Sequence, residues 1–110
     1  MTYLITESQK DKLIFTYLDN QDFKVIESEK QIFFVNSEGD EFAQIVIDKE
    51  DGFCEINYNL IHELTSFFPF SIIECRDYVS SWVSDKEGIY IYDSWSAPGY
   101  IRSNLKVKTR

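Results

Sequence analysis

Four short β-rich segments in the first half of the chain constrain its fold more than any other feature. They cover residues 23–28, 31–36, 41–48 and 53–58, and short polar turns separate them. Connections of about two to four residues can join only antiparallel neighbours, because parallel strands need a crossover of about a dozen residues or more. The spacing therefore predicts a four-stranded antiparallel meander.

Two of these segments indicate which residues face a core. In the third segment Ala43, Ile45 and Ile47 occupy alternate positions, which predicts one well-buried face. The second segment is apolar on both faces, because Phe33 and Phe34 are neighbours. If helices cover one face of the sheet, one of these two rings points to the other face. We expect a homodimer through that face.

Two helical patterns flank the meander. Residues 7–19 begin behind a capping-box pair, Thr6 and Gln9, and repeat apolar residues at helical spacing. A second, short helix is expected over residues 60–68, with Asn59 as its cap and Pro69 as its stop. Both helices have an apolar face, which is typical of an amphipathic helix.

The last third of the chain contains one longer helix and weaker signals after it. Ser71 and Glu74 form a second capping-box pair, the helix behind them runs to about residue 85, and Gly88 is placed to end it. Residues 89–92 alternate Ile and Tyr and predict a short strand, followed by a turn at Pro98 and Gly99. Residues 100–107 are either a last edge strand or loose chain.

Together these elements predict one α+β domain over residues 1–110. We expect an N-terminal helix, a four-stranded antiparallel meander, two helices packed on one sheet face and a short C-terminal strand, with residues 102–110 as a basic tail. The chain is 44% hydrophobic and 16% aromatic, which supports one core and excludes disorder. No apolar run approaches the roughly 20 residues of a membrane span, so we expect a cytoplasmic protein without membrane contact.

Charge is divided unevenly along the chain. Residues 1–101 contain all nineteen acidic residues and seven basic ones, a net charge of −12, whereas residues 102–110 add four basic residues and no acid. An acidic body repels a phosphate backbone, so we expect no direct nucleic-acid binding by it. The same field attracts a basic protein, and an acidic surface can imitate DNA or RNA towards such a partner. The alternative is an ordinary solvated surface.

The usual catalytic and metal-binding patterns are incomplete. His62 is the only histidine, and Ser66 stands where the zinc pattern H-E-x-x-H needs its second histidine. The acids between residues 48 and 55 do not fit a calcium loop, because with Gly52 in sixth place the first ligand position is Ile47. The four glycines lie too far apart for a phosphate-binding loop. We therefore expect no metal, no cofactor and no catalytic activity.

A small enzyme or ligand-binding domain stays open as an alternative. Its site would be a cleft between sheet and helices near His62, with Cys54 or Cys75 as nucleophile. Both cysteines fall on predicted apolar faces, where an inert thiol is expected. The position of His62 separates the two hypotheses. A buried ring bonded to the backbone favours an interaction protein, and a cleft shared with a cysteine or carboxylate favours an enzyme.

The densest group of candidate binding residues lies near the C-terminus. It combines aromatic rings with a cation, the residue types that dominate interface hot spots and that also hold single-stranded nucleic acid: Tyr90, Tyr92, Trp95, Tyr100 and Arg102. The alternative is that alternate rings pack against the helices and the others coat one face of a strand.

Two resemblances bear on function. Ile5 to Gln9, followed by Leu13, is similar to the start of many small uncharacterised proteins of tailed phages. This implies a phage accessory protein, a group in which small acidic inhibitors of host defence enzymes occur. The acidic α+β architecture resembles type III secretion chaperones, dimers that bind extended partner segments, although four strands precede the second helix here.

These observations together predict a small acidic, non-catalytic protein-interaction domain. In this interpretation the domain inhibits or modulates a basic or nucleic-acid-handling host protein, which it attracts through its net negative charge. The enzyme or ligand binder with a cleft near His62 is the first alternative. A chaperone-like dimer that binds an extended protein segment is the second.

Overall fold

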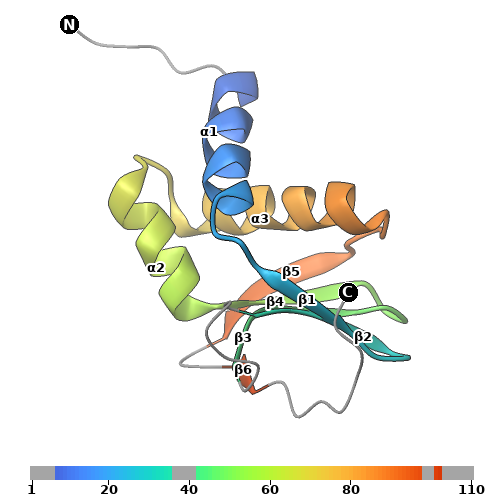
Figure 1. Cartoon of the computed structure of the whole chain (residues 1–110). Coiled ribbons are helices and arrows are strands. Elements are labelled where there is room, and N and C mark those ends of the chain that lie inside the picture. The colour runs from blue at the N-terminus through green and yellow to red at the C-terminus, as the bar shows by residue number, and fades with distance from the viewer. Residues whose placement is uncertain (1–6, 36–41, 98–100, 103–110) are drawn as a thin grey trace, which may run out of the picture.

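The computed structural model describes residues 7–35, 42–97 and 101–102 and shows an α+β fold (Figure 1). All three helices lie on the same side of one sheet, where the sequence predicts two of them. The helices are α1 (Glu7–Asp19), α2 (Tyr58–Phe67) and α3 (Ile72–Glu87). The strands are β1 (Lys24–Glu27), β2 (Gln31–Val35), β3 (Phe42–Asp48), β4 (Phe53–Asn57), β5 (Asp93–Ala97) and β6 (Ile101–Arg102).

The first four strands form the predicted antiparallel meander, and the sheet continues in the order β1-β2-β3-β4-β5. The fifth strand departs from this pattern, because β5 pairs parallel to β4, with Asp93 opposite Phe53 and Ala97 opposite Asn57. The chain between these strands, which forms α2 and α3, is long enough for the crossover that a parallel pair requires. The sheet is therefore mixed.

The C-terminal strand predicted at residues 89–92 is wrong in position. These residues belong to no strand: Ile89 and Ile91 pack against the core, whereas Tyr90 is 79% exposed and Tyr92 is 68% exposed. The Tyr92 backbone N–H donates to the Gly52 carbonyl oxygen at 2.8 Å, which ties the segment to the β3–β4 turn. The alternation of Ile and Tyr thus reflects alternate burial, and the strand itself begins at Asp93.

The sixth strand, β6, pairs with the first residues of β3. Ile101 pairs with Ala43 and Arg102 with Phe42, on the stretch of β3 that β4 leaves when the chain turns into α2. Part of the predicted 100–107 edge strand is therefore present. The predicted turn at residues 98–99 and the tail beyond Arg102 lie outside the described residues.

The helix ends follow local capping signals. The predicted bounds of α1 are confirmed, as is the capping box in which Ser71 and Glu74 bond each other's backbone N–H groups. Gly88 ends α3 in the left-handed conformation, with φ 65°. The cap of α2 is a correction: Asn57, not Asn59, caps the helix, because its side-chain oxygen accepts the Asn59 backbone N–H at 2.7 Å.

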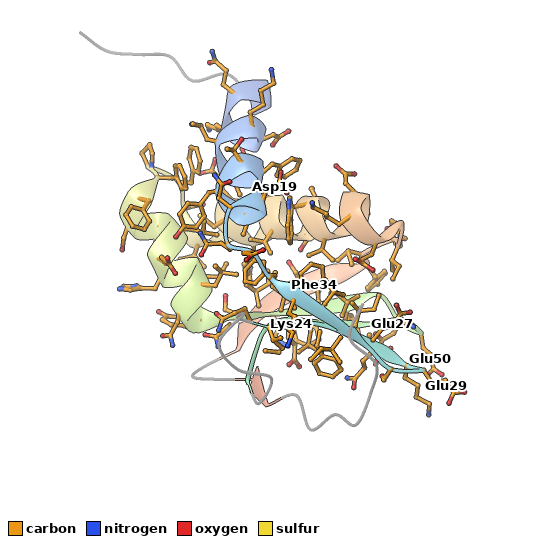
Figure 2. The ribbon with its side chains drawn as sticks, viewed as in Figure 1. Asp19, Lys24, Glu27, Glu29, Phe34 and Glu50 are labelled. Atoms are coloured by element: carbon orange, nitrogen blue, oxygen red, sulfur yellow. The ribbon has the colours of Figure 1, made fainter. Side chains whose placement is uncertain are left out.

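The main core lies between the helices and the sheet. Phe34, labelled in Figure 2, points into it and packs against the rings of Phe23 and Trp82, at centroid distances of 6.1 and 5.3 Å. Ile45 and Ile47 belong to this core, but the prediction that Ala43 shares their face is wrong. A register shift next to Phe34 moves Ala43 to the opposite face, since it inserts an extra residue into β3.

The opposite face of the sheet carries a second, smaller cluster, made by Ile26, Phe33, Val35, Ala43 and Val46. Phe33 points to this face and Phe34 to the main core, so the expectation that the two rings diverge is confirmed. Within the single chain Phe33 is 3% exposed and Phe34 is 2% exposed. Neither ring therefore offers the free surface on which the expected homodimer depends. Among the described residues no helix is long and apolar enough to cross a lipid bilayer.

Candidate functional site

A pocket of about 220 Å³ opens on the helix-free face of the sheet. Cys54 and Ile56 of β4 face the main core, so the alternate residues Phe53 and Glu55 face the other way. Trp95 of β5 lies opposite Glu55 in the parallel register and closes one side. The pocket is lined by Gln31, Val46, Asp48, Asp51, Phe53, Glu55 and Trp95.

Aromatic rings form one wall of this pocket. Phe53 packs against Trp95 with ring centroids 5.0 Å apart, and against Tyr92 at 5.8 Å. The partial exposure of Phe53 and Trp95 leaves ring surface open to a ligand. Within the described part of the chain, the indole N–H of Trp95 has no hydrogen-bond partner.

Three carboxylates stand around the rings. One oxygen of Asp48 accepts the Glu50 backbone N–H at 2.9 Å, and one oxygen of Asp51 accepts the Phe53 backbone N–H at 3.1 Å. These bonds hold the β3–β4 turn and orient both groups. The Glu55 carboxylate makes no hydrogen bond or ion pair with any described residue. Among the described residues no three acid, His or Cys side chains are grouped closely enough to hold a metal ion.

The acidic character continues beyond the pocket. Figure 2 shows Glu27, Glu29 and Glu50 together at the end of the sheet where the β1–β2 and β3–β4 turns lie. Lys49 forms an ion pair with Glu27 and donates to the Ser28 carbonyl oxygen at 2.9 Å. The Lys49 ammonium group is therefore bound between the two turns. The pocket thus presents negative charge beside aromatic faces, which is an arrangement suited to an organic cation.

The predicted binding residues near the C-terminus are not brought together in one place. Trp95 lines the pocket, and Tyr92 borders it through Phe53. Tyr90 lines a separate hollow against α3. The backbone of Arg102 lies in β6 beside Phe42, and Tyr100 lies outside the described residues.

Sequence reasoning missed Phe53 and Glu55 as binding residues. The signal was present in part, because the acids between residues 48 and 55 stand out in the sequence and Phe53 alternates with Cys54. What was missing is the parallel pairing of β4 with β5, which places Trp95 beside them. No local pattern specifies a pairing between segments about forty residues apart.

The alternative site requires His62 in a cleft beside a cysteine, and the structure places it differently. His62 is exposed on α2 and stacks on the Tyr58 ring, with centroids 6.4 Å apart. Cys54 and Cys75 are buried, and burial raises the pKa of the first thiol to about 12 and that of the second to about 11. Both thiols are therefore protonated near neutral pH, and the nucleophilic thiolate is scarce.

The comparisons with known proteins add no family. No family model matches this chain, and neither a curated protein nor a solved structure matches it.

Proposed function

We propose that this chain is a non-catalytic protein-interaction domain that binds a Lys or Arg side chain of a basic partner in the pocket of Trp95, Phe53 and Glu55. The observation that carries the proposal is the Glu55 carboxylate, which is unpaired among the described residues, beside two partly exposed rings. A cation over an aromatic face gains about 0.5–1 kcal/mol at an exposed site. An adjacent carboxylate adds a charge-assisted hydrogen bond.

The size of the pocket favours a side chain of a macromolecule over a free small molecule. Its volume of about 220 Å³ lies below the roughly 300–1,000 Å³ of typical small-molecule sites. One basic side chain gives little affinity alone, so the remainder must come from the surrounding surface. Nineteen acidic residues in the chain supply a field that accelerates encounter with a basic protein and repels nucleic acid.

A domain of this kind suits a protein that occupies the nucleic-acid-binding surface of another protein. The partner would present Lys or Arg where it normally meets phosphate, and the acidic body would take the place of that phosphate. The similarity of residues 5–13 to the start of small phage proteins supports a host protein as the partner. Binding of this type weakens as salt screens the charges.

The test is a titration of the purified chain with the peptide acetyl-Arg-Gly-Arg-Gly-Arg-amide, followed by amide and indole NMR shifts at low and high salt. We expect the largest shifts at Glu55 and at the Trp95 indole, and loss of binding at high salt. Glu55→Gln and Trp95→Ala should each weaken binding about two- to fivefold, the range for an exposed ion pair or cation–π contact.

Asp11→Asn is the matched control, because it removes the same charge from α1, on the helix side of the sheet. It should change the affinity less than Glu55→Gln does. If both variants weaken binding equally and the NMR signal of the Trp95 indole does not shift, the peptide is attracted only by the net charge of the chain. The pocket is then not the binding site. In a pull-down from host lysate, a genuine partner is retained by the native chain and recovered in smaller amount with Trp95→Ala.

A further inference from the structure

The strand beside the pocket has one unoccupied edge. β5 pairs with β4 on one side, and no strand in the described part of the chain pairs with its other side. The backbone N–H and C=O groups of alternate residues on that side therefore lack partners in the sheet. Such an edge can accept an extended segment of another chain as an additional strand.

A groove lies between α3 and residues 90–94, which include the start of β5. It consists of two hollows of about 240 and 260 Å³ that share Ser80, Ser81 and Ile91 and so form one continuous space. The Ser80 hydroxyl at its base is buried and lies beside the Cys54 thiol, with which it interacts.

The charge of the groove matches that of the pocket. Asp77 and Asp85 line it from α3 and Asp93 lines it from β5, and the described lining residues include no Lys or Arg. The Asp77 and Asp93 carboxylates stand where the groove meets the start of β5, and Asp85 stands at the part of the groove before the strand. An extended segment with basic residues is therefore attracted to the groove beside the start of β5.

The pocket and the groove lie on opposite faces of the same strand. Trp95 faces the pocket with Glu55, so its neighbours Ser94 and Ser96 face the helix side, where Cys54 and Ile56 are buried. Side chains on an added strand alternate in the same way. We propose that a basic, extended segment of the partner adds to the free edge of β5, with alternate side chains directed to the Trp95 face and to the groove under α3. This inference rests on the basic partner of the proposed function.

The probe is the peptide acetyl-Lys-Thr-Lys-Val-Lys-Thr-Lys-amide, compared with an analogue N-methylated at its three central residues. The analogue keeps every charge but loses backbone donors on both of its edges. We expect it to bind about tenfold more weakly, the loss that corresponds to about two backbone hydrogen bonds. Amide exchange should slow at alternate residues of Asp93–Ala97 when the parent peptide binds, since these groups gain partners.

A groove-filling variant provides the second measurement. Ser81 is exposed on α3, so Ser81→Phe narrows the groove without disturbing the core. This substitution should weaken binding of the seven-residue peptide at least about fivefold and leave binding of the short arginine peptide unchanged. Ser66→Phe, also at an exposed serine but on α2, is the matched control and should bind both peptides normally.

The outcomes separate the two proposals. Equal binding of the parent and N-methylated peptides, with unchanged amide exchange in β5, would overturn strand addition. This holds even if Glu55→Gln still weakens binding of the arginine peptide. If neither peptide binds, the proposed function has failed together with the inference drawn from it.

Discussion

Gly52 joins the β3–β4 turn to the segment that leads into β5, and replacing it tests the packing of the pocket. Its φ is 73°, and its carbonyl oxygen accepts the Tyr92 N–H. A Cβ there would lie 2.9 Å from the Tyr90 carbonyl oxygen and 3.0 Å from the Tyr92 nitrogen. Both atoms belong to the backbone, so they cannot rotate away. Gly52→Ala must therefore displace the segment that carries Tyr92 against Phe53.

The magnitude follows from two terms. A left-handed conformation costs a non-glycine residue about 1–2 kcal/mol, and about 0.4–1 kcal/mol of this is offset because alanine stiffens the unfolded chain. The steric conflict adds about 1–3 kcal/mol, as overpacking does elsewhere. The free energy of unfolding should therefore fall by about 1–5 kcal/mol in Gly52→Ala.

Gly88 provides a matched control. Its φ is 65°, but a Cβ would meet nothing within 4 Å, so Gly88→Ala carries the conformational cost alone, about 1 kcal/mol. Urea denaturation followed by circular dichroism measures both variants, and a slope of roughly 1–3 kcal/mol per molar urea converts the difference into separate midpoints. Equal midpoints for the two variants would refute the close approach of residues 90–92 to the turn.

Three further predictions concern stability and reactivity. The pKa of Asp19 is lowered in the folded state, first by the hydrogen bond from the Trp82 indole. The Asp19 carboxylate therefore stabilises the fold at pH values above the ordinary aspartate pKa, and this stabilisation is lost as the pH falls through the lower pKa of the folded state. Urea midpoints of the native chain and Asp19→Asn should therefore differ at pH 6 and converge below about pH 4, and a constant difference would contradict this. Ser71→Ala removes a helix cap and should lower the free energy of unfolding by about 1 kcal/mol in the same assay. Cys54 and Cys75 should react with a disulfide reagent only in denaturant, and rapid labelling of the native chain would show that they are accessible.

The parts of the fold that the sequence predicts well depend on neighbouring residues. The bounds of α1, the capping box at Ser71 and the end of α3 at Gly88 each involve residues about four positions apart or fewer. The meander is also local, because its turns are too short for any other pairing. The N-cap of α2 was misplaced by two residues, since Asn57 and Asn59 are equivalent by residue type and only their geometry separates them.

The strand β5 could not be located from its own residues. Aspartate, serine and alanine have low strand propensity, whereas the preceding Ile and Tyr residues have high propensity and alternate. Pairing with β4 overrides this preference, because the crossover through α2 and α3 returns the chain parallel to β4 at residue 93. Propensity indicates a strand in the right region but not the residues that pair.

The candidate site depends on the same pairing. Trp95 was recognised from its residue type, and the carboxylates near Gly52 were conspicuous, but only the register of β5 against β4 brings the two groups together. A shift of one residue would turn Trp95 towards the main core and place Ser94 or Ser96 beside Glu55. The burial of Cys54 and Ile56 specifies which residues of β4 face the core, and so leaves Phe53 and Glu55 on the open face. Cys54 and Ile56 thus determine which residues of β4 line the pocket, although neither of them lines it.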